Sequence, residues 1–253
     1  MRLAVITDIH GNFRALQAVL ADITSQSIAR IVSLGDNVGY GPEPDEVVRT
    51  LVHHRITSIR GNHELALVNA AYYQQLNPPT RLSLDLTRGL LTQTSLDWLA
   101  DLEPTLQLAN GTDDETGHRC RFVHGCPPDS TTTYLLNPTD ARLQHIFAGY
   151  PEAICFAGHT HTLDMYVYHP DAAVEHLSLA IGRRILARNS RYLIIPGSVG
   201  QPRDTVSNRA KYAIWDQDQN SLEIRAVPYD VSTTIRLINE RGFPASNGLR
   251  LQW

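Results

Sequence analysis

The sequence predicts an α/β fold in which two β-sheets pack face to face with helices outside them. Three observations point to this fold class. Strand-like and helical segments alternate through the first third of the chain, β-rich runs crowd the second half, and five strand-like runs end in side chains that can bind a metal. Because functional groups of open α/β sheets gather beyond the carboxyl ends of strands, we expect the five endings to converge.

The first third of the chain is predicted to form two successive β-α-β units. Short apolar or β-branched runs predict strands at residues 3–7, 31–34 and 56–60. Asn12 can cap the first helix, whose apolar residues recur at helical spacing, and the second helix is expected at residues 43–54. Two consecutive units of this kind imply parallel strands.

The middle of the chain is predicted to be helical from residue 65 to residue 104. Pro78 and Pro79 interrupt it, and Ser95 can cap its last helix. The segments that follow are a hairpin of strands 106–109 and 120–124 around a polar turn at 110–118, a helix near 139–147 and a strand at 153–157. Residues 65–104 are the least patterned part of the chain.

The second half is predicted to be rich in strands. They are expected at residues 165–169, 174–179, 181–187, 192–196, 212–216 and 222–227. Asp230 can cap a final helix, which Gly242 and Pro244 stop. With 253 residues and 42% hydrophobic content the chain can bury a sizeable core, so we expect one domain over residues 1–253.

The composition excludes several classes of partner. With 22 basic and 26 acidic residues the formal net charge is -4, which supplies no electrostatic footprint for duplex nucleic acid or an anionic membrane. No window approaches the roughly 18 apolar residues that a membrane span needs, and no cleavable leader is evident. The three cysteines, Cys120, Cys126 and Cys155, are widely separated and favour reduced thiols. We expect a cytoplasmic protein.

The five strand endings share a chemistry. They are Asp8-Ile9-His10, Gly35-Asp36, Gly61-Asn62-His63-Glu64, His124-Gly125 and Gly158-His159-Thr160-His161. Oxygen and imidazole donors together suit Mn²⁺, Fe, Zn²⁺ or Co²⁺ better than Ca²⁺. The donors outnumber what one ion needs, and a carboxylate such as Asp36 can bridge two ions about 3.5–4 Å apart.

Each ending also has an ordinary structural interpretation. Asp-x-His alone has roughly one chance in ten of binding a metal, since polar pairs at strand ends are common turn chemistry. His63 and Glu64 can simply open a helix with a favourable acid in its first turn. The Gly-His-Thr-His segment is the most specific single motif, because two histidines at i and i+2 have little structural reason to be there. The conjunction of all five favours the metal site.

In order and spacing these segments resemble the calcineurin-like metallophosphoesterase superfamily, including its small bacterial and archaeal members. The matching motifs are Asp8–Asn12, Gly35–Pro42, Gly61–Glu64, Val123–Gly125, Gly158–His161 and Pro196–Asp204. The resemblance covers the chain from Met1 to about Tyr229, with residues 66–118 matching least. It implies a four-layer α/β/β/α sandwich of two mixed β-sheets flanked by helices.

The resemblance also implies residue roles. Asp8, His10 and His161 would hold one metal, Asn62, His124 and His159 the other, and Asp36 would bridge them. The implied cofactors are two ions of Mn, Fe, Zn, Co or Ni, with Mn or Fe favoured. A hydroxide held by the dinuclear centre would attack phosphorus, without a phosphoenzyme. His63 would interact with the leaving group, as a general acid only if its pKa stays near or above the working pH.

Three further residues are weaker candidates for binding substrate. Asn12 can bond to substrate or tie loops together, and Arg60 and Arg203 can pair with phosphate or brace loops. Cys126 can place a thiol near the second metal, although a small, partly buried residue is the favoured interpretation. Tyr72, Tyr73 and Trp98 can stack on a base, but aromatic residues at helical spacing more often belong to the core.

Other hydrolase classes lack their residues here. Ser198 does not sit in a Gly-x-Ser-x-Gly elbow, and no Gly-Lys-Ser/Thr phosphate loop occurs. The predicted substrate is a small phosphate ester, with dinucleoside polyphosphates or phosphoproteins as alternatives, and residues 66–118 together with the Tyr40 loop are the expected selectors. A catalytically weak binding scaffold, as in the retromer subunit that resembles these enzymes, is the rival function. A homo-oligomer is compatible with leftover apolar faces.

Overall fold

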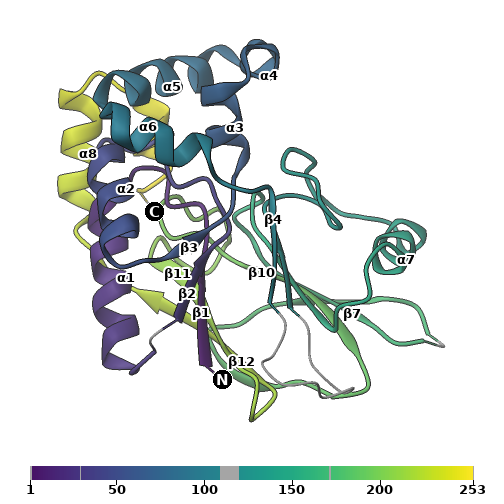
Figure 1. The fold of residues 1–253 in the computed structure, drawn as a ribbon. Helices are drawn as coiled ribbons and strands as arrows, with labels where there is room; N and C mark the ends of the chain where they lie inside the picture. The colour runs from purple at the N-terminus through teal and green to yellow at the C-terminus, as the bar shows by residue number, and fades with distance from the viewer. Residues whose placement is uncertain (1, 29, 109–119, 171, 253) are drawn as a thin grey trace.

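The computed structural model describes residues 2–28, 30–108, 120–170 and 172–252, and it contains two six-stranded mixed sheets that lie face to face (Figure 1). The first sheet consists, in spatial order, of β3 (Thr57–Ser58), β2 (Arg30–Ser33), β1 (Arg2–Ile6), β11 (Ala210–Asp216), β12 (Ser221–Val227) and β9 (Gly182–Ile185). The second consists of β4 (Thr105–Leu108), β5 (Cys120–Val123), β6 (Ile154–Ala157), β10 (Arg191–Pro196), β7 (Leu163–Tyr168) and β8 (Glu175–Ser178).

The pairing of the strands follows the predicted topology. β1 and β2 pair in parallel, as do β2 and β3, so the two β-α-β units are confirmed. β1 pairs antiparallel with β11, which makes the first sheet mixed. β4 and β5 are antiparallel neighbours, as a hairpin requires, while the polar turn predicted at 110–118 lies outside the described residues.

Helices cover both outer faces of the sandwich and one of its ends (Figure 1). The helices are α1 (Phe13–Ser25), α2 (Pro44–His53), α3 (Asn62–Val68), α4 (Ala70–Gln75), α5 (Pro78–Leu90), α6 (Gln93–Ala100), α7 (Asp140–Ala148), α8 (Val231–Glu240) and α9 (Ala245–Leu249). α1 and α2 pack on the outer face of the first sheet, and α7 packs on that of the second. The predicted four-layer α/β/β/α sandwich is therefore confirmed.

The main core fills the space between the sheets. Leu3, Val5 and Trp215 from the first sheet meet Phe122 and Phe156 from the second, and all five are buried. Side chains alternate along a strand, so Ala4 and Ile6 turn to the opposite face and pack under the helices. Burial on both faces explains why β1 reads as an uninterrupted apolar run.

The helices α3 to α6 form a separate cluster at one end of the sandwich, here called the helical segment (residues 62–100) (Figure 1). Their apolar side chains make a small core of their own, which includes Leu67, Leu84 and Leu99. None of the helices in the described part of the chain is long and apolar enough to cross a lipid bilayer.

Three details of the prediction were wrong. Thr92, rather than Ser95, caps α6, because the backbone N–H of Ser95 donates to the Thr92 hydroxyl, while the hydroxyls of both residues donate to Asp45 of α2. The strand expected at 56–60 contains only Thr57–Ser58. The chain does not end its helices at Pro244, since α9 begins immediately after it.

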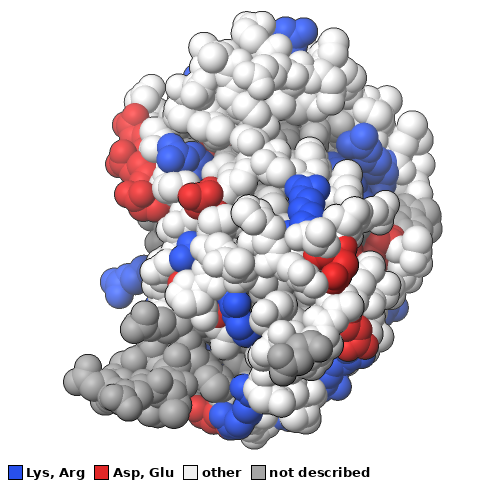
Figure 2. Space-filling view, turned by 90° about the vertical axis from the view of Figure 1, so that its right-hand side faces the viewer, with Lys and Arg blue, Asp and Glu red and all other residues white. Residues whose placement is uncertain are grey.

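Figure 2 views the molecule from the side that carries the second sheet and α7. Basic and acidic groups are interspersed over this face, and most of it is uncharged. The face therefore has no extended field of one sign.

Candidate metal centre

The seven side chains predicted to ligate metal lie together at one end of the sandwich. They follow the carboxyl ends of β1, β2, β5 and β6 or begin α3, and all are at least 95% buried: Asp8, His10, Asp36, Asn62, His124, His159 and His161. β1 and β2 belong to the first sheet, whereas β5 and β6 belong to the second. The cluster therefore joins the ends of both sheets.

The donor atoms fall into two groups that share one carboxylate. Donors of Asp8, His10, Asp36 and His161 all lie within 4.8 Å of one another. Donors of Asp36, His124 and His159 form the second group within the same limit, and Asn62 Oδ1 lies 3.1 Å from His124 Nε2. Asp36 is thus positioned between two sets of donors, each compact enough to surround one ion.

An unusual backbone conformation places these side chains. Asp8, His10, Asp36, His159 and His161 have φ angles of 54°, 51°, 52°, 69° and 61°. Residues other than glycine rarely adopt this left-handed conformation, which costs about 1–3 kcal/mol each and persists only where the surroundings impose it. The strands end in tight turns that aim consecutive polar side chains into one space.

Glu64 imposes the geometry of two of these loops. Its buried carboxylate accepts the backbone N–H groups of Asp36, Asn37 and Gly61 at 2.8 Å each and of Val38 at 3.2 Å. The clamp joins the loop after β2 to the start of α3. From the sequence, Glu64 was interpreted only as a favourable acid in the first turn of a helix. Its role in joining the two loops was missed.

Gly61 is required where these two loops meet. A Cβ atom at this position would collide with the backbone nitrogen and the carboxylate of Asp36. The close approach lets the His63 N–H donate to Asp36 Oδ1 at 2.9 Å. The carboxylate is thereby held at the N-terminus of α3, where the helix dipole favours negative charge.

Three imidazoles are oriented by backbone carbonyls. Nδ1 of His10, His124 and His161 lies 3.3, 2.8 and 2.6 Å from the carbonyl oxygens of Val38, Leu34 and Gln201, respectively. A carbonyl only accepts hydrogen bonds, so each Nδ1 carries a proton, and in the neutral imidazole Nε2 then presents its lone pair. This arrangement is the usual support of a metal-binding histidine.

The lone pairs face other acceptors. His10 Nε2 lies 3.1 Å from His161 Nε2, and His124 Nε2 lies 3.3 Å from Asp36 Oδ2. Acceptor atoms at these distances repel each other unless a cation or a proton lies between them. The donor set therefore fits bound metal ions.

His159 uses its ring differently. Its Nε2 lies 3.2 Å from the Thr132 carbonyl oxygen and must donate to it, so the lone pair is on Nδ1. Its backbone N–H donates to both carboxylate oxygens of Asp8 at 3.2 Å. The same segment thus supplies an imidazole to the second group and orients a carboxylate of the first.

Charge in the cluster is balanced between carboxylates and imidazoles. Burial alone would raise the pKa of Asp36, but His124 and His63 outweigh it and hold that pKa well below its usual range. Burial alone would lower the pKa of His124, but the Asp36 carboxylate raises it to about 9. Burial, aided by His124, lowers the pKa of His159 to about 3. Two buried carboxylates thus require positive charge nearby.

His63 lies against the first group without belonging to it. Its Nε2 is 3.9 Å from Asp36 Oδ2, and its ring centroid is 4.7 Å from that of His10 and 4.6 Å from that of Tyr40. Its Nδ1 is buried without a hydrogen-bond partner and faces Gly39. Burial lowers the pKa of His63. The protein's own groups therefore do not keep this pKa near or above the working pH, as a general acid requires.

The three substrate-binding candidates differ in position. The Asn12 amide donates to Gly200 O at 3.0 Å and to Tyr229 Oη at 3.1 Å, and its oxygen accepts from Ala15 N and Thr234 Oγ1, both at 3.2 Å. Its bonding capacity is taken by the protein, which matches the alternative in which it ties loops together.

Of the two arginines, Arg203 is the one with a backbone hydrogen bond to a residue of the cluster. Its backbone N–H donates to the His161 carbonyl at 3.3 Å, and its Nε is buried without a hydrogen-bond partner. The backbone N–H of Arg60 donates to the Glu103 carbonyl at 2.7 Å, on the side of the loop that leads to the helical segment. A contact between Arg60 and substrate stays a prediction.

The remaining candidate side chains lie in different surroundings, some in the apolar core and some near the cluster. The Cys126 thiol donates to Pro127 O and packs among the apolar residues under α7, and Cys126 belongs to neither donor group within the described residues. The Tyr73 hydroxyl donates to Asp85 at 2.7 Å. Tyr72 approaches the cluster, because a hydrogen bond to Asn62 is among the influences on its pKa.

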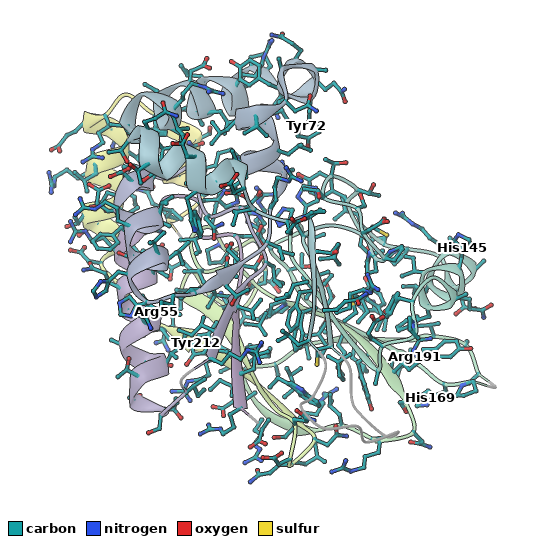
Figure 3. The ribbon with its side chains drawn as sticks, in the orientation of Figure 1. Arg55, Tyr72, His145, His169, Arg191 and Tyr212 are labelled. Carbon is teal, nitrogen blue, oxygen red and sulfur yellow. The ribbon has the colours of Figure 1, made fainter. Side chains whose placement is uncertain are left out.

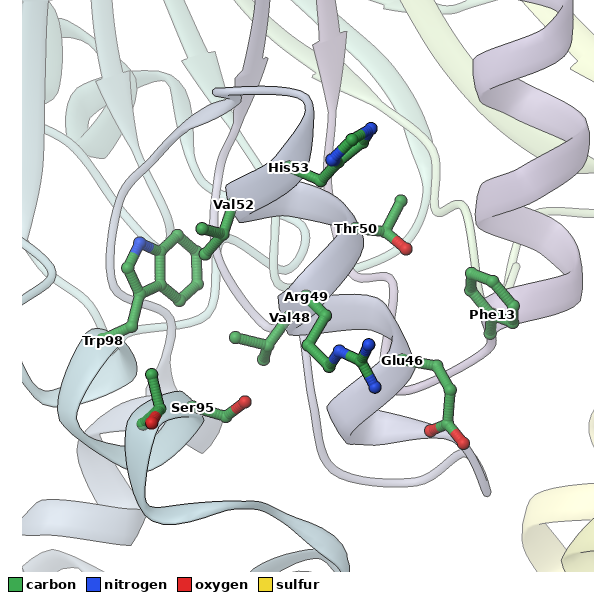
Figure 4. Close-up of a pocket in the computed structure, with 10 residues that line it drawn as sticks. Phe13, Glu46, Val48, Arg49, Thr50, Val52, His53, Ser95 and Trp98 are labelled. Carbon is green, nitrogen blue, oxygen red and sulfur yellow. The ribbon is translucent and has the colours of Figure 1, made fainter.

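Trp98 lines a different hollow. This hollow of about 690 Å³ lies among α1, α2 and α6, and Val52 and Phe13 also line it (Figure 4). It contains none of the predicted site residues. Tyr134, which the sequence interpretation missed because no motif surrounds it, instead stacks on His159 with ring centroids 3.6 Å apart.

Comparison with known proteins places these observations in a family. The sequence profile of the calcineurin-like phosphoesterases matches residues 1–163. An uncharacterized protein of Methanocaldococcus jannaschii is 32% identical over 249 residues, which cover 98% of this chain and 96% of the relative.

Solved structures agree over the whole fold. The crystal structure of a metallophosphoesterase from Sphaerobacter thermophilus superposes with a TM-score of 0.79 at 32% identity and covers 99% of this chain and 98% of that one. A hypothetical protein from Pyrococcus horikoshii has the same fold, with a TM-score of 0.78 at 20% identity and coverage of 99% and 97%. The chain therefore belongs to the calcineurin-like phosphoesterase family.

Proposed function

We propose that the protein is a metal-dependent phosphoesterase that hydrolyses small phosphate esters at a centre of two metal ions. The observation that carries this proposal is the sharing of Asp36 by two compact donor groups. A shared carboxylate is what a pair of ions needs as an anionic bridge.

The assignment of ligands follows the two groups. Asp8, His10 and His161 would hold the first ion, Asn62, His124 and His159 would hold the second, and Asp36 would be shared by both. Mixed oxygen and nitrogen donors favour Mn or Fe, with Zn, Co or Ni as alternatives. When bound, such a pair lowers the pKa of a water molecule and draws electron density from phosphoryl oxygens.

The chain's own groups orient the substrate and the departing oxygen. His63 lies 3.9 Å from the bridging carboxylate and is free at Nδ1, so it can turn toward a leaving group without losing a protein partner. Burial lowers its pKa, but a dianionic phosphate ester in the same pocket acts in the opposite direction and favours the imidazolium. Protonation of His63 is therefore coupled to substrate binding.

A binding scaffold on the same fold is the alternative function. It needs neither two complete donor groups nor a histidine beside them, yet this chain has both. The buried and oriented imidazoles favour catalysis, because structural burial of so many polar groups is costly without a ligand.

The test is metal-dependent turnover. Metal-depleted protein is reloaded with Mn²⁺, Fe²⁺, Zn²⁺, Co²⁺ or Ni²⁺, bound metal is counted by elemental analysis, and hydrolysis of bis(p-nitrophenyl) phosphate and p-nitrophenyl phosphate is followed. We expect two ions per chain and turnover that Asp36→Ala abolishes. The matched control is Asp97→Ala, which removes an exposed carboxylate on α6. Two bound ions without turnover of any ester would favour the scaffold.

A further inference from the structure

Tyr134 forms a platform beside the second donor group. It lies in the loop that follows β5 and His124, and its ring stacks on His159 at a centroid distance of 3.6 Å and an interplanar angle of 25°. One face of the ring is therefore covered, yet Tyr134 is 44% exposed. An exposed aromatic ring fixed in orientation beside a buried polar cluster is suited to stacking on a planar ligand.

Tyr72 approaches the same group from the helical segment. Burial raises its pKa to about 12, Asp36 and Tyr134 act in the same direction, and a hydrogen bond with Asn62 opposes them. In Figure 3 Tyr72 lies at the edge of the helical segment that is turned toward the sheets. It is thus the side chain through which α4 reaches the candidate centre.

Arg203 supplies a positive charge that acts on both Tyr134 and His63. Burial raises the pKa of Tyr134 and Arg203 opposes that effect, while Arg203 also helps to lower the pKa of His63. Its Nη2 donates to Gln201 Oε1 at 3.0 Å, but its Nε is buried without a partner. A buried donor without a partner is destabilising, and a phosphate oxygen of a ligand would satisfy it.

We propose that Tyr134, Tyr72 and Arg203 form a recognition site for a nucleoside attached to the phosphate, with the base stacked on the free face of Tyr134 and Arg203 on a non-bridging phosphate oxygen. This inference rests on the proposed phosphoesterase function and names its substrate class. The free face of Tyr134 is the face turned away from His159, so the tyrosine ring separates a ligand bound there from the His159 imidazole. A ring bound there needs a spacer between itself and phosphorus, and ribose supplies one.

The residue types at the site support this class of ligand. Base stacking on tyrosine tolerates every base, since each has a flat π-face. Arg203 provides the planar guanidinium that binds phosphate oxygens in fixed geometry. Tyr72 comes from the part of the chain that the sequence predicts to select the substrate, so through this side chain the helical segment would contribute to specificity.

The experiment compares two diesters that share one leaving group. The p-nitrophenyl ester of thymidine 5′-monophosphate and ethyl p-nitrophenyl phosphate release the same phenol, so their ratio of kcat/KM reports recognition of the nucleoside. We expect the metal-loaded protein to prefer the thymidine ester by roughly 5- to 100-fold, the range that one stacked base contributes. Tyr134→Leu should bring the ratio close to one, and Tyr134→Phe should keep it.

Controls separate stacking from a general disturbance. Leu136→Ala alters an exposed residue of the same loop, 59% accessible, and Tyr73→Leu alters the neighbour of Tyr72, so both should keep the parental ratio. A ratio that is near one in the parent protein, or that Tyr134→Leu leaves unchanged, overturns the inference while the phosphoesterase function stands.

A binding measurement makes the inference testable without turnover. Calorimetric titration of the metal-loaded protein with thymidine 5′-monophosphate and with inorganic phosphate should show tighter binding of the nucleotide, and Tyr134→Leu should remove the difference. Equal affinities for the two in the parent protein would contradict the inference. Loss of turnover with both diesters, by contrast, counts against the proposed function alone.

Discussion

The loops at the strand ends and the helical segment are built by different rules. The loops place Asp8, His10 and Asp36 in left-handed conformations, bury them and hold them with backbone hydrogen bonds. The helical segment has ordinary helices around its own small core and leaves Val68 and Leu82 about half exposed, at 48% and 49%. The comparison indicates that the geometry of the donor groups comes from loops held on the sheets, whereas the helical segment packs around a core of its own.

The two regions are nevertheless connected at the loop after β2. The Thr87 hydroxyl of α5 donates to Gly39 O at 2.8 Å, and the Tyr40 hydroxyl lies 3.3 Å from Thr80 Oγ1. Gly39 and Tyr40 lie within four residues of Asp36. The helical segment can therefore influence the centre through the loop, apart from any contact of Tyr72 with substrate.

The largest expected effect is that of His63→Ala. Loss of an imidazole positioned for proton transfer should lower kcat by roughly 10²- to 10⁴-fold. Bound metal, counted by elemental analysis, should stay at the parental level because His63 belongs to neither donor group. His145→Ala, which changes a histidine on α7, should retain parental kcat (Figure 3). A His63→Ala protein with unchanged kcat would remove His63 from the reaction.

Removing the buried ion pair between Asp204 and Lys211 should lower the stability of the fold. Lys211 Nζ lies 3.0 Å from Asp204 Oδ2, and Lys211 is fully buried. Asp204→Ala leaves that ammonium uncompensated and should lower the free energy of unfolding by about 3–5 kcal/mol, measured by urea denaturation. Replacing both residues, as Asp204→Ala with Lys211→Met, should recover part of the loss. Additive losses in the double variant would show that the pair is not coupled.

Glu64→Gln tests the clamp between the two loops. An amide presents only one acceptor atom to four backbone N–H groups, so we expect a loss of about 1–3 kcal/mol in unfolding free energy. Metal affinity should fall by roughly 10- to 100-fold, as for other residues that orient ligands. Glu240→Gln changes an exposed glutamate of α8 and should alter neither quantity. Parental metal affinity in Glu64→Gln would mean that the loops keep their geometry without the clamp.

Thr87→Val removes the hydrogen bond between α5 and Gly39 with little change in volume. The free energy of unfolding should fall by about 1 kcal/mol, and KM should change more than bound metal because the Tyr40 loop is displaced. If KM and metal content both remain at the parental level, the helical segment does not influence the metal centre through its hydrogen bond to Gly39.

The smallest effect is expected on the exposed surface of the helical segment. Leu82→Ser should change the unfolding free energy by no more than about 0.5 kcal/mol and leave kcat unchanged. Leu82 lies on the exposed side of α5. A large loss of activity in this variant would therefore contradict the view that the loops at the strand ends, and not the helical segment, set the geometry of the centre.

Much of the fold could be predicted because burial leaves local signals. Apolar runs marked the strands and 3.6-residue spacing marked α1 and α2. The sequence could not choose between Ser95 and Thr92 as a cap, since both carry hydroxyl groups. In the fold both hydroxyls donate to Asp45, and the Thr92 hydroxyl also accepts the backbone N–H of Ser95, which makes Thr92 the cap. It could not reveal Tyr134, whose role depends on a stacking partner 25 residues farther along the chain.

The sequence by itself determined the family, the two-sheet sandwich and the identity of the clustered donors, because these depend on residue type and on spacing along the chain. Only the tertiary structure decided which nitrogen of each imidazole faces the cluster. It also decided that the Asn12 amide makes its hydrogen bonds within the protein and that burial lowers the pKa of His63. Those properties arise from neighbours that are distant in sequence, and electrostatic and hydrogen-bond energies depend on distances that no local pattern encodes.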